Sequence, residues 1–314
     1  MQIKKGQNVS KADRVSKKKL FRNNIGLYVM LLPGLIYLIV FKYLPMYGIA
    51  IAFQDFNIFQ GVSGSEWVGM ANFAKIFSDP EFYRIFTNTL IISISKLLIL
   101  FPLPIIIALI LNEIRSPWYK KTTQTIIYLP HFISWVIVAG IFTSLLSPSS
   151  GLVNIIITAL GGEPVSFMMS NSWFRKVLVF SDGWKETGYS AVVYIAAIAG
   201  VDQQLYEAAK VDGAGRLRMI WSITLPSIAT TIVLMLILRL GTILEAGTEQ
   251  ILAMYNPTVY QTGDVIGTYV YRMGLGQQQY STTTAVGLFN SVVGFILVVS
   301  GNFFSKKISG SSIW

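Results

Sequence analysis

Six stretches of this chain are apolar over about 20 residues each, and no other feature constrains its fold so strongly. An α-helix rises roughly 1.5 Å per residue, so a helix of that length crosses the roughly 30 Å hydrocarbon core of a bilayer. We place the predicted spans at 26–50, 87–111, 124–146, 177–199, 224–244 and 283–304. The sequence therefore predicts an all-α, polytopic membrane protein with six transmembrane helices.

The composition disfavours several other classes of protein. Hydrophobic residues make up 53% of the 314 residues and charged residues 13%, whereas soluble domains carry about 25% charged residues. Cysteine is absent and histidine occurs once, so we expect neither a disulfide framework nor a metal site. A membrane enzyme is a weak alternative, because the patterns G-x-S-x-G and H-E-x-x-H do not occur.

Lysine and arginine are distributed asymmetrically over the predicted topology. Residues 1–24 hold eight of them against one acid, and the predicted cytoplasmic segments together hold sixteen, against five in the outer segments. Because basic residues favour cytoplasmic loops, we expect a multi-pass membrane location with both termini in the cytoplasm. This asymmetry accounts for the net charge of +10 without nucleic acid as a partner.

These features divide the chain into three parts. We predict a basic cytoplasmic segment at 1–24, a membrane domain at 25–304 and a cytoplasmic tail at 305–314. The first apolar stretch follows a basic segment and could alternatively be a cleaved signal peptide. We favour an uncleaved helix, because its length exceeds the roughly 7–15 apolar residues of a signal-peptide core.

The predicted cytoplasmic segment 200–226 gives the strongest indication of function, and it reads GVDQQLYEAAKVDGAGRLRMIWSITLP. Residues 206–211 favour a helix, and Glu207 in its first turn would suit the positive end of the helix dipole. Gly213 permits a turn, after which a second helix resumes at Arg216. Pro226 suits the first turn of the next span, where its missing N–H is not needed. The segment thus predicts a helix, a bend and a second helix that enters the membrane.

This segment resembles the EAA loop of bacterial type I ABC importer permeases. The resemblance lies in the run EAA at 207–209, the glycine at 213 and the sequence ITLP at 223–226. It implies the type I ABC importer permease fold, with the short helix seated in a groove on a separate ATPase. The residues to which it gives a coupling role are Tyr206, Glu207, Ala208, Ala209, Asp212, Gly213, Ala214, Arg216 and Pro226. A helix that merely lies at the membrane surface is the alternative interpretation.

The chain has no motif with which it could hydrolyse ATP itself. No G-x-x-x-x-G-K-[ST] pattern occurs, so a P-loop is excluded and the motor must be another polypeptide. The family resemblance implies two such ATP-binding subunits, with ATP and Mg bound there and no cofactor on this chain.

Longer segments resemble the carbohydrate-importer permeases of the multiple-sugar and polysaccharide-fragment branch, which are similar to maltose permeases. These segments lie at 31–53, 183–214, 249–272 and 308–314. The resemblance implies import of an oligosaccharide, a second related permease subunit and an extracytoplasmic solute-binding protein. Thr248 departs from the pattern, since we expect an aromatic residue at that position.

Charged residues inside predicted spans are candidates for the solute pathway, because each costs roughly 2.5–3.5 kcal/mol at the bilayer centre. They are Lys96, Asp182, Lys185, Glu186 and Arg239. Lys185 and Glu186 lie beside Trp184 and Tyr189, and such a mixture of polar groups and rings suits a sugar. Solute contact is therefore one interpretation of these four residues. For Asp182, Lys185 and Glu186 we favour the other interpretation, ion pairing within one helix, which their three- and four-residue spacings allow.

Further candidates follow the fifth predicted span on the outer side, where a solute could be handed over, although exposed polar loops would look the same. They are Glu245, Thr248, Glu249, Gln250, Tyr255 and Asn256. Asn290 in the sixth span could contact a ligand or hydrogen-bond a neighbouring helix. For His131 we favour a structural role over a proton relay.

Two other kinds of transporter remain as alternatives. An ion-coupled carrier or a channel would work without an ATPase, and the absence of two similar halves disfavours a carrier. An ABC importer could also move a non-sugar solute such as a glycerol phosphate. The family resemblance favours a carbohydrate over both.

Overall fold

The computed structural model describes residues 24–309, apart from the side chains at 304–306, 308 and 309. The predicted cytoplasmic segment at 1–24 therefore lies outside the described residues except for Asn24, and the predicted tail at 305–314 except for 305–309, which continue the last helix. The chain forms two compact units, Met1–Ala50 and Ile51–Trp314, and we describe each by itself.

The first unit is helical throughout its described part. It consists of α2 (Ile25–Leu38), the π-helical turn η1 (Ile39–Tyr43) and the beginning of the 3-10 helix η2 (Leu44–Phe53). Neither α2 nor η1 buries a residue within the chain. The whole helical run Ile25–Phe53 is long and apolar enough to cross a membrane, as the first predicted span requires.

The second unit begins with a hairpin of two short strands, which the all-helical prediction did not include. β1 (Gln54–Asp55) pairs antiparallel with β2 (Glu66–Trp67), and α3 (Gly61–Gly64) lies in the connection. This is the one sheet within residues 24–309. α4 (Ala71–Ser78) follows the hairpin.

The second predicted span is a pair of helices in sequence, α5 (Pro80–Leu100) and α6 (Pro102–Glu113). Asp79 caps α5, because its side chain accepts a hydrogen bond from the backbone N–H of Glu81 at 2.8 Å. Together the two helices form an apolar run of 34 residues, which confirms a span at this place.

The third predicted span is broken instead of straight. α7 (Pro117–Tyr128) and the 3-10 turn η3 (Leu129–Phe132) are followed, after a break, by α8 (Trp135–Leu145) at an angle of 101°. Pro130 cannot donate a backbone hydrogen bond, and the Ser134 side chain caps a new helix by accepting from the N–H of Ile137.

The fourth predicted span corresponds to α10 (Phe174–Ala199), which follows the short α9 (Leu152–Ala159). Its 26 residues are sufficient to cross a bilayer. By length and apolar composition, three helical runs among the described residues can span a membrane, or up to five if each bent pair counts as one. α10 is not among them because its sequence includes Asp182, Lys185 and Glu186.

The fifth predicted span begins earlier than expected and is bent. α11 (Gln203–Val211) precedes a helical run of α12 (Arg216–Met219), η4 (Ile220–Thr224) and α13 (Leu225–Ser227). That run meets α14 (Ala229–Gly241) at 61°. Pro226 lies in the first turn of a helix, the short α13, and the helical run resumes at Arg216 as predicted.

The chain between α14 and the last span is a series of short helical pieces. They are η5 (Ile243–Glu245), α15 (Thr248–Met254), η6 (Pro257–Val259), α16 (Tyr260–Gly263), α17 (Ile266–Val270) and η7 (Tyr271–Gly276). Ala246 and Gly247 have φ values of 52° and 79°, which turn the chain sharply before α15. The last span is α18 (Tyr280–Ser309).

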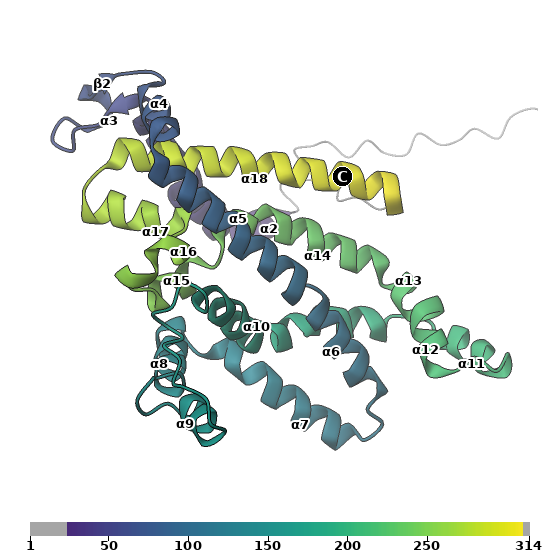
Figure 1. The fold of residues 1–314 in the computed structure, drawn as a ribbon. Helices are drawn as coiled ribbons and strands as arrows, with labels where there is room; N and C mark the ends of the chain where they lie inside the picture. The colour runs from purple at the N-terminus through teal and green to yellow at the C-terminus, as the bar shows by residue number, and fades with distance from the viewer. Residues whose placement is uncertain (1–23, 310–314) are drawn as a thin grey trace, which may run out of the picture. The chain divides into compact units, whose positions relative to one another are not determined.

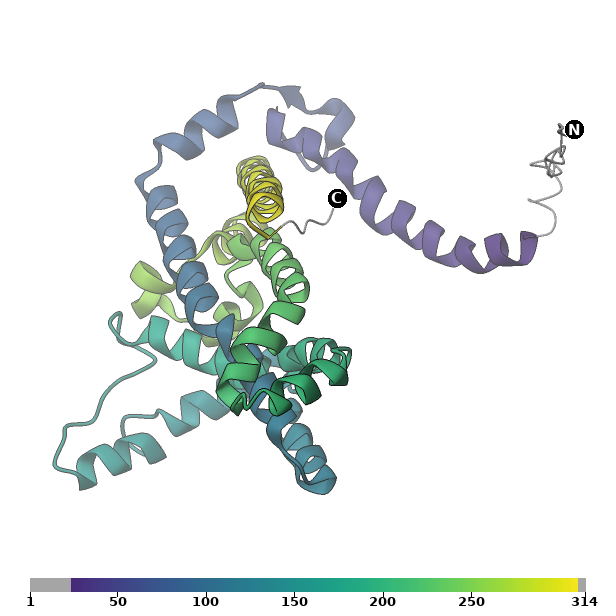
Figure 2. The same ribbon diagram turned by 90° about the vertical axis from the view of Figure 1, so that its right-hand side faces the viewer.

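Within the second unit, α10 packs against both α5 and α6, and α18 lies beside α14 (Figures 1 and 2). One core cluster forms where α10 meets α8 and α15, around Phe174 and Ile251. A second core cluster joins α4 and α5 to α17 and α18. α11 and α12 lie at the opposite end of this unit from the β1–β2 hairpin (Figure 1).

Candidate functional site

The predicted coupling segment, residues 200–226, folds as the sequence predicts, into a helix, a bend and a second helix. Gly213 has a φ of +73°, in the left-handed region that favours glycine. The prediction for Glu207 is wrong in one respect, because α11 begins at Gln203 and Glu207 lies beyond its first turn. The acid at the start of α11 is Asp202, whose side chain accepts from the N–H of Gln204 at 2.9 Å.

Most of the predicted coupling residues face away from the protein. Neither α11 nor α12 contains a buried residue. The exposed members are Glu207, Ala208, Asp212, Gly213, Arg216 and Pro226, and the half-buried ones are Tyr206, Ala209 and Ala214. The segment thus presents an exposed surface that is partly charged and partly apolar, since Val211 and Leu217 are also exposed.

Two side-chain contacts fasten this segment to the spans. The hydroxyl of Tyr206 lies 2.9 Å from the hydroxyl of Thr224, which is buried. Arg216 lies 3.5 Å from Glu113 at the end of α6, and both side chains are exposed. A force applied to α11 can therefore reach the helices that follow Thr224.

A second polar arrangement, the Lys96 network, lies inside the helical unit. The Lys96 ammonium on α5 lies 3.2 Å from the Asp182 carboxylate on α10 and donates to the carbonyl of Ala246 at 3.0 Å. It also donates to the side-chain carbonyl of Gln250, whose amide N–H donates to Ser181 at 2.8 Å. Lys96 is only 3% exposed. Its three partners, Asp182, Ala246 and Gln250, match the three N–H groups of a lysine ammonium.

The Lys96 network corrects two predictions. Gln250 was expected at the outer hand-over surface, but it is fully buried and bonds the interior of the unit. Asp182 was expected to pair within its own helix, but its cationic partners are Lys96 and, at 3.9 Å, Arg239 on α14. Helix spacing alone does not show which neighbouring helix supplies a counter-charge.

Three of the predicted pathway residues gather around His131. Glu186 lies 2.7 Å from the Lys185 ammonium and 2.8 Å from Nδ1 of His131. The ring of Tyr189 stacks on the His131 ring, with the centroids 3.8 Å apart. Lys185 also donates to the His131 carbonyl at 2.8 Å. The contacts agree with a structural role for His131, which holds η3 against α10.

A polar pocket of ≈ 240 Å³ lies between α6, α10 and α14, and it includes Glu186. The other polar residues that line it are Asp182, Thr187, Ser190, Tyr194, Arg239 and Thr242. Sequence reasoning singled out Arg239 only as a charge within a span, and it missed the hydroxyl groups of this pocket. Their common α10 face could have indicated them, since 182, 186, 187, 190 and 194 follow helical spacing.

Arg239 distinguishes this pocket from the two ion-paired groups beside it. Asp182 lies close to Lys96, and Glu186 lies close to Lys185 and His131. The Arg239 side chain remains 49% exposed, and its one ion pair with a described residue is the 3.9 Å contact with Asp182. The pocket therefore offers a guanidinium and several hydroxyl groups to a polar solute.

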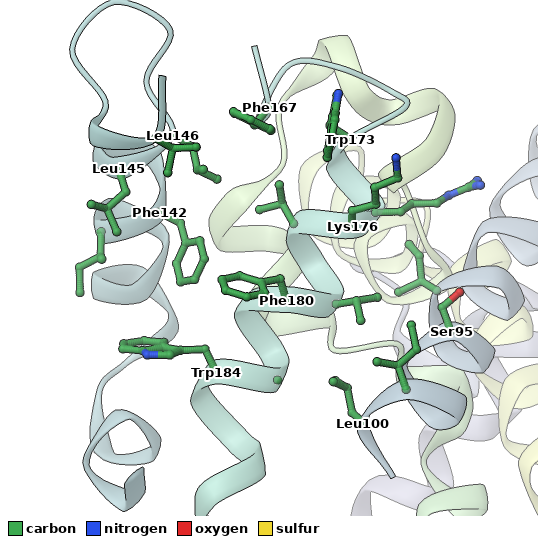
Figure 3. Close-up of a pocket in the computed structure, with 18 of the residues that line it drawn as sticks. Ser95, Leu100, Phe142, Leu145, Leu146, Phe167, Trp173, Lys176, Phe180 and Trp184 are labelled. Carbon is green, nitrogen blue, oxygen red and sulfur yellow. The ribbon is translucent and has the colours of Figure 1, made fainter. Parts of the chain in front are cut away.

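The remaining predicted residues lie elsewhere. Trp184 points into a separate apolar cavity, where the centre of its ring lies 5.9 Å from the centre of the Phe142 ring (Figure 3). Glu245 and Asn290 line a third pocket of ≈ 400 Å³, where the Asn290 carbonyl oxygen is buried and has no hydrogen-bond partner among the described residues. The structure therefore separates residues that the sequence grouped as one pathway.

The outer candidates help to hold the short helices after α14 together. Thr248 donates to the carbonyl of Glu245 at 2.7 Å, and Asn256 donates to the carbonyl of Met168 at 3.1 Å. Tyr255 packs against Tyr260, and Glu249 is exposed in the first turn of α15.

Thr248 itself contacts Gly267 at very short range. A Cβ placed on Gly267 would lie 1.9 Å from the Thr248 hydroxyl, so any side chain at 267 would displace Thr248. A small residue at 248, where an aromatic one was expected, therefore allows α15 to pack closely on α17.

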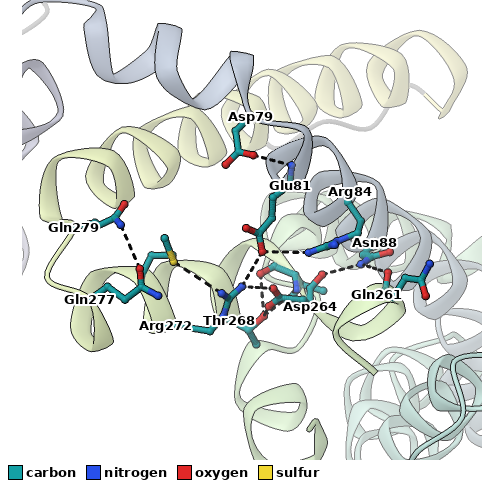
Figure 4. A network of polar contacts seen from close by, with 12 residues as sticks. Asp79, Glu81, Arg84, Asn88, Gln261, Asp264, Thr268, Arg272, Gln277 and Gln279 are labelled. Carbon is teal, nitrogen blue, oxygen red and sulfur yellow. Dashed lines mark hydrogen bonds and ion pairs between the residues drawn. The ribbon is translucent and has the colours of Figure 1, made fainter. Parts of the chain in front are cut away.

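An ion-pair cluster fastens this outer segment to α5 (Figure 4). Arg272 pairs with the buried Asp264 at 2.5 Å and with Glu81 at 3.3 Å. Burial alone would lower the pKa of Arg272, but the two carboxylates more than compensate and raise it. Asn88 on α5 donates to the carbonyls of Gln261 and Asp264, both at 3.0 Å.

The arrangement defines a class of protein. Helices long enough to cross a membrane enclose a polar pocket, and an exposed helix at one end can receive force from a partner. Among residues 24–309, no three His, Asp or Glu side chains gather to hold a metal ion. These are the features of a transport subunit.

Comparison with known families agrees with this class. Residues 101–310 match the family of binding-protein-dependent transport system inner membrane components. The chain belongs to this family, so it is an inner-membrane transport subunit and not an enzyme.

Two relatives from Bacillus subtilis (strain 168) match almost the whole chain. The polygalacturonan/rhamnogalacturonan transport system permease protein YteP is 48% identical over 288 residues, covering 92% of this chain and 90% of the relative. Protein LplB is 47% identical over 288 residues, covering 92% and 91%.

A solved structure confirms the type I ABC importer permease fold. It is a crystal structure of a bacterial ABC transporter involved in the import of the acidic polysaccharide alginate. The match has a TM-score of 0.86 at 45% identity and covers 93% of this chain and 98% of that one. A second structure of the alginate transporter, in complex with an alginate pentasaccharide-bound periplasmic protein, matches with a TM-score of 0.87 at 43% identity, covering 95% and 99%.

Proposed function

We propose that this chain is the permease subunit of an ABC importer that carries acidic oligosaccharides into the cytoplasm. The relatives support a carbohydrate as the substrate. One is a polygalacturonan/rhamnogalacturonan transport permease, and a similar solved structure is that of a transporter involved in the import of alginate. Both polymers contain uronic acids, which carry a carboxylate at neutral pH. Acidic sugars are therefore the substrate class that these similarities favour over neutral sugars.

The position of Arg239 is the structural observation that favours acidic sugars as the substrate. Its guanidinium is half exposed in the polar pocket, while the acids beside it already have cationic partners. A guanidinium binds carboxylates in a bidentate, charge-assisted geometry. Thr187 and Ser190 line the same pocket and can hydrogen-bond sugar hydroxyl groups.

The exposed coupling segment supports two ATP-binding subunits as further partners, with ATP and Mg bound on them. Alternating access would then follow from movement of α11, transmitted through Tyr206 to Thr224. A second, related permease completes the assembly, and an extracytoplasmic binding protein delivers the sugar. In this assembly both termini face the cytoplasm, as the distribution of basic residues favours.

The test is uptake into proteoliposomes that contain the complete importer, with oligogalacturonides compared with neutral oligosaccharides of equal length. We expect ATP-dependent uptake of the acidic series. The variant Arg239→Gln should reduce that uptake by about 10- to 100-fold, the equivalent of one charge-assisted hydrogen bond.

Arg239→Lys should retain part of the uptake, because it keeps the positive charge. Lys75→Gln, which also removes an exposed positive charge but lies on α4 away from the pocket and the coupling segment, is the control and should leave uptake unchanged. Equal uptake of neutral and acidic oligosaccharides, unaffected by Arg239→Gln, would overturn the proposed substrate class.

A further inference from the structure

A large apolar cavity lies apart from the polar pocket, on another side of α10. It has a volume of ≈ 990 Å³ and is bounded by α5, α8 and α10 (Figure 3). Phe142 and Leu145 from α8 face Phe180 and Trp184 from α10 across it. It contains no residue of the Lys96 network, so sugar transport as derived above leaves it unexplained.

The cavity is apolar along its length and cationic at one end. Arg175 and Lys176 line it near the N-terminus of α10, where Lys176 lies beside Trp173 (Figure 3). The Lys176 ammonium lies 4.2 Å from the centre of that ring. A tryptophan beside a lysine is typical of the level where lipid headgroups meet hydrocarbon.

Neither of these cations is neutralised by the protein in the part of the chain that the structure describes. Arg175 donates to the carbonyl of Thr262 at 3.0 Å and to the side-chain carbonyl of Asn88 at 2.6 Å, and both acceptors are uncharged. Lys176 is exposed and forms no salt bridge with any described residue. The cavity rim therefore keeps a net positive charge.

The depth of the cavity matches one leaflet of a bilayer. Its lining on α10 runs from Trp173 to Trp184. At roughly 1.5 Å per residue this stretch is about 16 Å long, close to half of the roughly 30 Å hydrocarbon core. An acyl chain that starts at the cationic rim would therefore end near Trp184, at the middle of the membrane.

We propose that this cavity binds an anionic phospholipid, with the phosphate at Arg175 and Lys176 and the acyl chains between α8 and α10. A phosphate supplies the counter-charge that the rim lacks, and acyl chains match the apolar walls. A helix from a partner subunit would cover the walls but would leave the two cations without a counter-ion. The lipid site is independent of the imported solute.

The experiment is native mass spectrometry of the complete importer, titrated with phosphatidylglycerol or phosphatidylcholine of identical acyl chains. We expect about tenfold tighter retention of the anionic lipid, a difference that one charge-assisted contact produces. Equal retention of the two lipids would overturn the proposal.

Two variants locate the site. Lys176→Glu should abolish the preference for phosphatidylglycerol, and Ser95→Phe, which fills the cavity from α5, should weaken retention of both lipids. Lys75→Glu on the exposed side of α4 is the matched control and should retain the preference. An unchanged preference in Lys176→Glu would count against this cavity as the site.

A photo-reactive residue in place of Phe180 separates lipid from protein as the occupant, and it remains informative if a variant folds poorly. The adduct expected after illumination is a phospholipid. A cross-linked peptide from a partner permease, or from residues 24–50 of this chain, would show that a helix covers the cavity instead.

Discussion

The coupling segment and the Lys96 network contain similar kinds of residue but stand in opposite environments. In the network, a buried lysine, aspartate and glutamine satisfy one another across α5, α10 and α15. In the coupling segment, α11 buries no residue, and one hydroxyl contact from Tyr206 fastens it to the spans. Polar residues therefore hold helices together in one region and remain available to a partner in the other.

The difference follows from desolvation. A charge taken out of water must find a partner inside the protein. Removal of one member of a buried pair leaves the other charge buried and unpaired, which lowers the stability of the fold strongly. An exposed charge loses little when its partner is removed, because water replaces it. Changes in the network should therefore alter stability, whereas changes in the coupling segment should alter transport at nearly unchanged stability.

Deletion of residues 206–215 should have the largest effect on transport. We expect the subunit to insert into the membrane, while ATP-dependent uptake falls to background, because the surface for the ATPase is gone. Insertion is measured by protease protection and uptake in proteoliposomes. Uptake at the wild-type rate would refute a coupling role for this segment.

Lys96→Met should have the largest effect on stability. It leaves the Asp182 carboxylate buried with only the more distant Arg239, and the expected loss is about 3–5 kcal/mol in the free energy of unfolding. The double variant Lys96→Met with Asp182→Leu should recover much of that loss. Unfolding in detergent is the measurement, with the exposed Lys75→Met as control. A loss no greater than that of the control would contradict the structural role of this network.

Gly213→Ala should cost about 1–2 kcal/mol locally, because its φ of +73° is unfavourable for any residue with a Cβ. No atom lies within 4 Å of that added Cβ, so the effect is conformational only. Gly215→Ala is the matched control, since Gly215 has a φ of −72° and equally open surroundings. ATPase coupling should fall in the first variant and persist in the second; the same rate in both would argue against a required bend.

Tyr206→Phe should have the smallest effect. It removes one hydroxyl contact with Thr224, which contributes about 1 kcal/mol. Uptake should slow moderately, and Thr224→Val should slow it to a similar degree. If the two residues act through this contact, the double variant will be no slower than either single one; additive slowing would show that they act separately.

The coupling segment was predictable because its signals are local. A glycine with a left-handed φ, good helix formers and a nearby proline determine a short helix and a bend whatever lies around them. The Lys96 network was not predictable, because Lys96 and Gln250 are 154 residues apart in sequence. The sequence marked Lys96, Asp182 and Arg239 as charges in spans but did not show which would pair.

The sequence by itself determined that this chain is a helical membrane protein and where the helix–bend–helix segment 200–226 lies. Hydrophobic length and local backbone preference are properties of contiguous residues, so they can be inferred without knowing how the helices pack. Only the tertiary structure decided that Gln250 belongs to the interior, that the third span is broken before Trp135 and that Arg239 faces the polar pocket. Those features depend on which helices meet, because a buried polar group is stable only where another part of the chain supplies its partner.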